Sequence, residues 1–163
     1  MNDSKIKKMK RIVAISIFSL VIVTAHSQVR HFVDDQEKLF LKEEVAGMDS
    51  LLAGYYARTG NHVGVVSIDT LMGPLNDFIQ QFVQKMGLDK INDKYGMVLF
   101  LSRKQSMINI RVNLNLEKFV SDSLLMTIIS AGIPDLKEKR TAKGVMEICR
   151  AGMNFMDSVA KKP

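Results

Sequence analysis

The sequence predicts an α/β (α+β) fold, in which a small mixed β-sheet carries helices on both faces as an α/β/α sandwich. Segments 62–68 and 96–102 are apolar and rich in β-branched residues, as expected of strands that are covered on both sides. A helical pattern lies between them, so the two strands should run parallel and be joined by a right-handed crossover. A short turn then leads to an alternating segment, 107–113, which is typical of a hairpin.

Residues 1–27 have the order of a cleavable signal peptide. Five basic residues lie between Lys5 and Arg11, an uncharged apolar run covers 12–24, and the small residues Ala25 and Ser27 follow. The run is shorter than the roughly 20 residues that span a bilayer. We expect cleavage after Ser27 or after Ala25, export to the periplasm or the medium, and no transmembrane anchor after cleavage. An uncleaved anchor is the alternative.

Without this leader, residues 28–163 have the size of one domain. The leader holds five of the 23 Lys and Arg and one of the 17 Asp and Glu, so the formal net charge falls from +6 to +2. This balance argues against a nucleic-acid partner. Cys149 is the single cysteine, and its apolar neighbours predict a buried, unreactive thiol. A structural zinc site is excluded because no Cys or His partner has the right spacing.

The first helix of the domain is expected to begin after Asp34. Asp34 and Glu37 can accept the free N–H groups of a helix start, much as in a capping box. Apolar residues then recur at three- and four-residue steps: Leu41, Val45, Met48, Leu51, Leu52, Tyr55 and Tyr56. Gly60 should end this helix in the left-handed conformation, and Asp69 should end the strand that follows.

Three more helices are expected. The first runs from about Leu75 to Met86, ends at Gly87, and is followed by a polar loop over 89–95. Another covers 124–131, with Ser121 or Asp122 as its cap and Pro134 as a stop signal just beyond it. Thr141 can cap the last helix, which turns an apolar stripe inward: Val145, Ile148, Cys149, Met153, Phe155 and Met156.

Several short landmarks occur along the chain in a characteristic order. They are Val33-Asp34, Thr59-Gly60, Met86-Gly87-Leu88, Tyr95-Gly96, Leu116-Glu117, Asp122, Ile128-Ile129, Ile133-Pro134 and Gly144. In order and spacing, the stretch from Phe32 to about Phe155 resembles the TPM-domain family. That family is named in part for thylakoid-lumen acid phosphatases and photosystem repair factors, and it has many bacterial envelope members. The resemblance implies an α/β sandwich.

Two loops depart from the family pattern. The family usually has Gly-Tyr-Gly before Leu-Glu-Gly, whereas this chain has Asn113-Leu114-Asn115 before Leu116-Glu117-Lys118. Asn tolerates left-handed backbone, so the turn should keep its shape while its side chains occupy space that glycine leaves open. Where the family tends to have Asp-Asn-Gly, this chain has Lys94-Tyr95-Gly96, with Asp93 one residue earlier. The sequence also stops without the membrane helix and glycine-rich tail of many relatives.

A metal-assisted phosphatase would need oxygen ligands for Ca²⁺ or Mg²⁺ on loops that meet at one edge of the sheet. The candidates are Asp69, Asp93, Asn113, Asn115, Glu117 and Asp122, with Asp93 and Asp122 as catalytic candidates. Each also has an ordinary role open to it, as a strand end, a turn, a left-handed position or a helix cap. Lys94 would weaken cation binding by repulsion. Lys94 and Lys118 could instead hold an anionic group.

Our first hypothesis is an exported interaction or accessory module with degraded catalytic loops and an envelope protein complex as its partner. An intact fold pattern combined with altered glycine and aspartate positions motivates it. The alternatives are a metal-dependent, acid phosphatase-like hydrolase, which the resemblance implies for some relatives, and a divalent-cation-binding module without catalysis.

Overall fold

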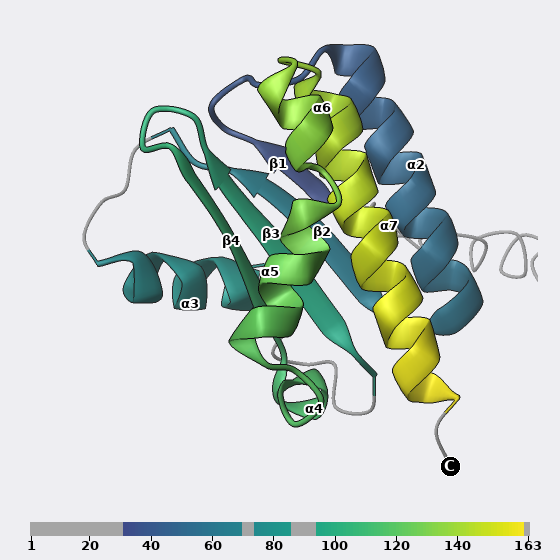
Figure 1. Ribbon diagram of the computed structural model, residues 1–163. Coiled ribbons are helices and arrows are strands. Elements are labelled where there is room, and N and C mark those ends of the chain that lie inside the picture. The colour runs from purple at the N-terminus through teal and green to yellow at the C-terminus, as the bar shows by residue number, and fades with distance from the viewer. Residues whose placement is uncertain (1–30, 70–73, 86–93, 162–163) are drawn as a thin grey trace, which may run out of the picture.

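The computed structural model describes residues 31–69, 74–85 and 94–161. The predicted leader, the end of the predicted second helix and Asp93 lie outside these ranges. Four strands form one sheet in the order β1 (Val33–Asp35), β2 (His62–Ser67), β3 (Gly96–Ser102) and β4 (Met107–Val112) (Figure 1). The first three are parallel, and β4 pairs antiparallel with β3. The predicted mixed sheet, with a parallel pair and a hairpin, is confirmed.

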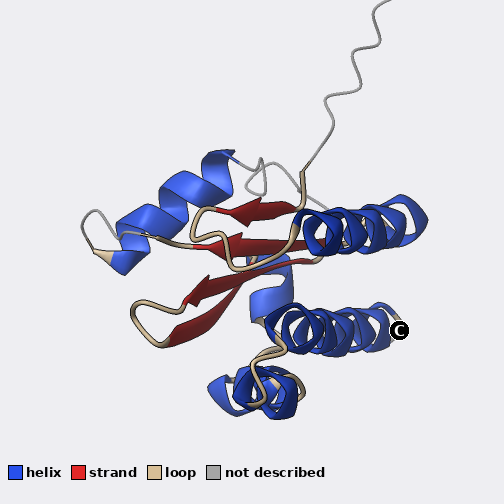
Figure 2. Ribbon diagram, turned by 90° about the horizontal axis from the view of Figure 1, so that it is seen from above, coloured by secondary structure: helices blue, strands red, loops and turns tan. Residues whose placement is uncertain are grey.

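Helices cover both faces of the sheet, as predicted (Figure 2). On one face lie α2 (Lys42–Thr59), α5 (Asp122–Ser130) and α7 (Thr141–Ala160), and on the other lies α3 (Leu75–Lys85). The larger core packs side chains such as Met48, Leu99 and Met156 between the sheet and the first group. Both cores consist of residues between Phe32 and Val159, so residues 28–163 contain every described part of the core.

The two β-α-β crossovers have opposite hands. From β1 to β3 the strands advance across the sheet in one direction, while the connecting helices α2 and α3 lie on opposite faces. Crossovers between parallel strands are right-handed in nearly all proteins. One of the two crossovers is therefore a left-handed exception.

The start of α2 differs from its prediction. Asp34 lies in β1, and α2 begins eight residues later, at Lys42, with Leu41 as the N-cap residue. The Leu41 side chain cannot accept a hydrogen bond, but the Glu44 carboxylate accepts one from the Leu41 backbone N–H at 2.8 Å. Gly60 ends the helix with φ of 72°, as predicted.

Three short elements were missed by sequence reasoning. They are β1, α4 (Leu114–Glu117) and α6 (Ile133–Lys137). The helix before Pro134, α5, ends at Ser130 in agreement with the predicted stop, and Pro134 itself lies in the first turn of α6, where a missing N–H costs nothing. Ser121 caps α5 as predicted, by accepting a hydrogen bond from Leu124. α7 begins at Thr141, but its N-cap residue is Arg140.

A buried polar network ties α2 to α7. The Tyr55 hydroxyl donates to the Asp157 carboxylate at 2.8 Å and accepts from the Asn61 side chain at 3.2 Å. Burial, more than any neighbour, raises the pKa of Tyr55 to about 12. Cys149 is buried in α7 as expected, and burial raises the pKa of its thiol to about 12. Within the described ranges, no helix combines the length and apolar character that crossing a bilayer requires.

Glycines allow the α5–α6 turn to approach α7 closely. A Cβ atom added to Gly132 would meet the Gly144 carbonyl oxygen and the Ile148 side chain well inside van der Waals contact. By contrast, Gly54 on α2 has open space where its Cβ would point. The two positions are therefore a matched pair for the same substitution.

We predict that Gly132→Ala lowers the free energy of unfolding by about 1–3 kcal/mol, because the backbone of α7 must move away. Gly54→Ala should raise it by about 0.5–1 kcal/mol, because alanine is the better helix former. Urea unfolding of residues 28–163 measures both changes. Equal effects at the two positions would contradict the close packing of the turn against α7.

Candidate functional site

Carboxylates gather at the end of the sheet where the parallel strands finish, and backbone groups hold the first of them. Asp35, the last residue of β1, accepts hydrogen bonds from the backbone N–H groups of Leu39 and Phe40 at 2.9 and 3.0 Å. The Ser67 hydroxyl, at the end of β2, donates to the same carboxylate. Asp35 thereby fixes the chain between β1 and α2.

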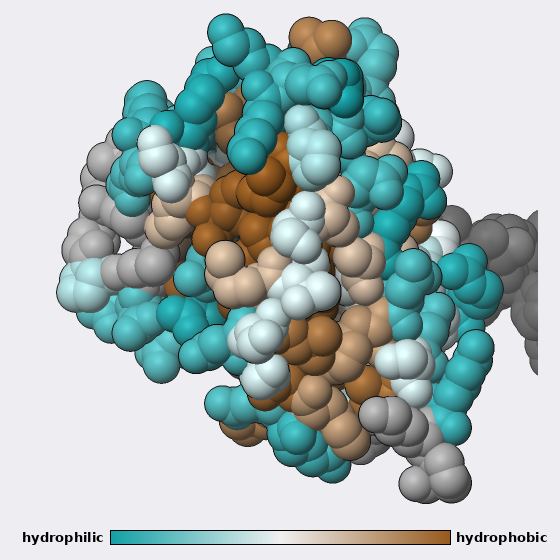
Figure 3. Space-filling view, in the orientation of Figure 1, coloured by the Kyte–Doolittle hydropathy of each residue, from teal (hydrophilic) through white to brown (hydrophobic). Residues whose placement is uncertain are grey.

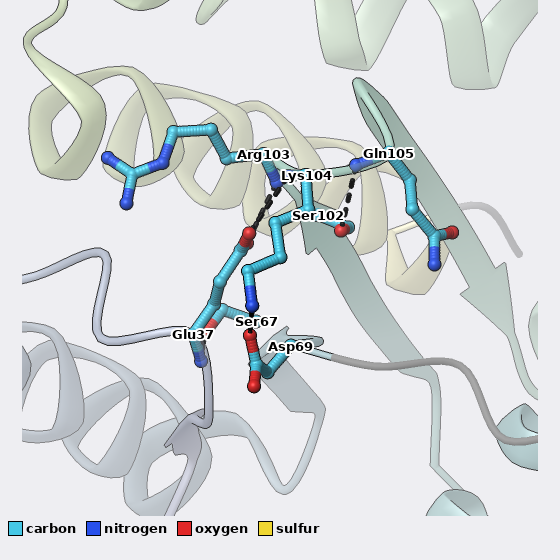
Figure 4. Close-up of polar contacts among 7 residues, drawn as sticks. All are labelled: Glu37, Ser67, Asp69, Ser102, Arg103, Lys104 and Gln105. Atoms are coloured by element: carbon cyan, nitrogen blue, oxygen red, sulfur yellow. Dashed lines mark hydrogen bonds and ion pairs between the residues drawn. The ribbon is translucent and has the colours of Figure 1, made fainter.

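Glu37 crosses from that connection to the β3–β4 hairpin (Figure 4). Its carboxylate accepts the backbone N–H groups of Arg103 and Lys104, each at 2.8 Å. Its own N–H donates to the Ser67 hydroxyl at 2.9 Å. Only 8% of Glu37 is exposed, so the two hydrogen bonds replace the water that a buried charge loses. We call this contact the Glu37 clamp.

Asp69 follows β2 at the same end of the molecule. Its carboxylate forms an ion pair with the Lys104 ammonium, and both side chains are exposed. Lys104 therefore contributes its backbone to the Glu37 clamp and its side chain to Asp69. The Arg103 side chain extends away from this cluster (Figure 4).

The opposite end of the sheet holds most of the other predicted site residues. The Asn113 amide donates to the Lys94 carbonyl at 2.7 Å, and its oxygen accepts the Leu116 N–H at 3.2 Å, which caps α4. The Asn115 amide lies 3.5 Å from the same Lys94 carbonyl. Asn113 has extended backbone, with φ of −78°, so the predicted left-handed conformation at this position is wrong.

Glu117, Lys118 and Asp122 lie on or beside two helices at this second end. Glu117 is in α4, Asp122 is the first residue of α5, and both are exposed. The Lys118 ammonium lies over the Phe119 ring, 5.1 Å from its centre. Asp93, a predicted ligand and catalytic candidate, is outside the described residues.

The structure does not bring the five described residues among the predicted metal ligands to one edge. Asp69 follows β2, next to the end of β3, whereas the Asn113 N–H bonds to Gly96 at the start of β3. Seven residues of β3 separate these ends by about 20 Å. In the described ranges, no three His, Cys, Asp or Glu side chains are grouped so that they could hold a metal ion.

The arrangement defines an α/β/α sandwich domain with a carboxylate-rich turn cluster at one end and an amide-closed turn at the other. The family model of the TPM domain matches residues 33–154. The chain therefore belongs to the TPM-domain family, as the sequence landmarks indicated. No curated protein matched the chain.

Solved structures share the fold. The N-terminal domain of a protein from P. gingivalis superposes with a TM-score of 0.65 at 23% identity, covering 81% of this chain and 85% of that one. The BA42 protein of the psychrophilic bacterium Bizionia argentinensis superposes with a TM-score of 0.60 at 18% identity, and the match covers 72% of this chain and 82% of that one. The N-terminal domain of the cg2496 protein of Corynebacterium glutamicum superposes with a TM-score of 0.57 at 13% identity, and the match covers 78% of this chain and 80% of that one. At these identities the likeness concerns the fold alone.

Sequence reasoning missed Asp35 and Glu37 as site residues. Their partners are backbone N–H groups, which leave no mark in the sequence, and those of Glu37 lie 66 and 67 residues away. The sequence pattern before the long helix instead favours Asp34 and Glu37 as a capping pair, which assigns Glu37 to the helix start and gives Asp35 no role.

We predict that Glu37→Gln lowers the free energy of unfolding by about 1–3 kcal/mol, because glutamine offers one acceptor oxygen where the N–H groups of Arg103 and Lys104 both need partners. Glu43→Gln is the matched control, since Glu43 is exposed in the first turn of α2. It should change stability by less than about 0.5 kcal/mol. Chemical denaturation of the three proteins gives the comparison, and a neutral Glu37→Gln would argue against the clamp.

Proposed function

We propose that this protein is an exported TPM-domain accessory module that binds an envelope protein complex and has lost the catalytic loops implied for some relatives. Membership of the family supplies the class of domain. The signal-like leader motivates export to the periplasm or the medium. The turn after β4, which the Asn113 side chain closes, supports a role without catalysis.

The observation that carries this proposal is the use of the Asn113 side chain. Its oxygen and its nitrogen are both engaged, with Leu116 and with the Lys94 carbonyl. Its Cγ atom lies 3.4 Å from where a Cβ on Gly96 would be, so the side chain fills the space beside the start of β3. A ligand that approached a glycine at this position would meet an amide that is already hydrogen-bonded.

The charges around the turn favour the same conclusion. Lys94 stands where the family tends to have an aspartate, and Lys118 stands where it usually has a glycine. Both side chains are exposed. Lys94, whose carbonyl accepts from Asn113, and Lys118 add positive charge at this end of the sheet, which raises the cost of placing a divalent cation there. A surface with these residues is better suited to contact with another macromolecule than to metal chemistry.

We predict that purified residues 28–163 do not hydrolyse p-nitrophenyl phosphate above background with Ca²⁺, Mg²⁺ or Mn²⁺. The double variant Asn113→Gly with Asn115→Gly restores the family's glycines and reopens the turn. Comparing its hydrolysis rate with that of the wild type isolates the effect of the asparagines. Turnover by the wild type that is abolished by Asp93→Ala with Asp122→Ala would establish the phosphatase alternative and overturn the proposal.

The accessory role itself also requires a partner. Affinity capture on residues 28–163 from solubilised envelopes of the source cells should recover one protein in amounts comparable to the bait. A bait heated beyond its unfolding transition is the control. Recovery of only the proteins that the unfolded bait also captures would contradict the accessory role.

A further inference from the structure

The end of the molecule beyond β1, β2 and β3, which we call the carboxyl end, uses most of its carboxylates internally, although Glu43 in the first turn of α2 is exposed. Asp35 and Glu37 accept backbone N–H groups, and Asp69 pairs with Lys104. The carboxylates around α6 are also paired: Asp135 forms ion pairs with Arg140 and Lys143, and Glu138 forms one with Arg140. At the start of α2, Glu44 accepts a hydrogen bond from the Leu41 N–H. Arg140, as the strongest influence, lowers the pKa of Asp135.

Several basic side chains at the carboxyl end are not paired with the described carboxylates. Five exposed basic side chains there have no hydrogen bond or ion pair with the part of the chain that the structure describes: Lys38, Lys42, Arg103, Lys137 and Lys139. They come from the β1–α2 connection, the start of α2, the β3–β4 hairpin, and the end of α6 with the connection that follows it. The upper end of the molecule is accordingly hydrophilic (Figure 3). α2 and α7 also begin here, and their N-termini add positive potential (Figure 1).

An exposed apolar side chain lies at the same end of the molecule. Leu41 is 67% exposed and occupies the N-cap position of α2, directly before Lys42. Ser, Thr, Asp or Asn at this position would stabilise the helix, and leucine does not. A residue that breaks a local rule at the surface indicates a role other than folding. An exposed leucine at an end of the molecule that also carries exposed basic side chains is the combination by which surfaces enter the interface of an anionic bilayer.

We propose that the carboxyl end binds the surface of an anionic phospholipid membrane, with Leu41 entering the interface and the five cations facing the lipid phosphates. The charge comes from four segments and so covers the whole end, which suits an extended anionic surface. The exposed leucine favours lipid over nucleic acid, because a bilayer offers it an apolar environment and a phosphate backbone does not. This inference is independent of the proposed accessory role.

Co-sedimentation with vesicles tests the proposal, using residues 28–163 so that the apolar leader cannot insert. The protein should bind vesicles of phosphatidylcholine with one third phosphatidylglycerol and not vesicles of phosphatidylcholine alone. Lys42→Glu with Lys137→Glu should lower the partition coefficient by about tenfold or more. Lys94→Glu with Lys118→Glu makes the same change in net charge at the other end of the sheet and should have a much smaller effect.

Leucine is tested by a second matched pair. Leu41→Ser removes the apolar group and supplies a better N-cap, so the protein stays folded while binding falls several-fold. Leu114→Ser, at a leucine that is 83% exposed at the other end, should leave binding unchanged. Thermal melting confirms that each variant is folded.

Three results would overturn the proposal. The first is an absence of sedimentation with anionic vesicles. The second is an equal loss of binding in the two charge-reversed proteins, which would mean that net charge alone drives binding. The third is tighter binding to a DNA duplex than to anionic vesicles, unaffected by Leu41→Ser, which would assign the carboxyl end to nucleic acid.

Discussion

The buried carboxylate of Glu37 is the contact on which the carboxyl end of this domain depends. It joins two connections that are far apart in the sequence, the one that leads into α2 and the one that turns β3 into β4. β1 has only three residues, so its own ladder with β2 holds the β1–α2 connection weakly. Ser67 links Glu37 to Asp35, so the ends of β1 and β2 and the hairpin form one hydrogen-bonded unit.

This use of carboxylates also determines the electrostatic character of the surface. A carboxylate that accepts backbone N–H groups keeps its charge but turns it inward, whereas the lysines of the same loops extend into solvent. A sequence with modest net charge therefore presents a basic end. At the opposite end, the side chains of Asn113 and Asn115 close the turn after β4. The two ends of the sheet thus differ in charge and in how accessible they leave the backbone.

Much of the fold could be predicted from the sequence, because it depends on local patterns. The bounds of β3 follow from an apolar run between Gly96 and Ser102, and Gly60 marks the end of α2. β1 was missed since three residues carry too little pattern, and the start of α2 was placed too early since Asp34 and Glu37 resemble a capping pair. Export, a metal site and a partner stay predictions.

The candidate site was harder to predict because it depends on topology. Asp69 was grouped with Asn113, Asn115 and Glu117, but a hairpin reverses the chain between them. The loop after β2 and the loop after β4 therefore lie at opposite ends of the sheet. The predicted hairpin already implied this separation. The Glu37 clamp was not implied by any pattern, since its acceptors and donors meet only in the folded chain.

Hydrogen exchange of the Arg103 and Lys104 backbone amides tests the central claim most directly. Both lie in an exposed hairpin turn, where amides ordinarily exchange at nearly the rate of an unfolded chain. The Glu37 clamp predicts that these two exchange slowly, with protection close to that of the β3 ladder, and that Glu37→Gln removes the protection while β3 keeps its own. Rapid exchange of both amides in the wild-type protein would contradict the account.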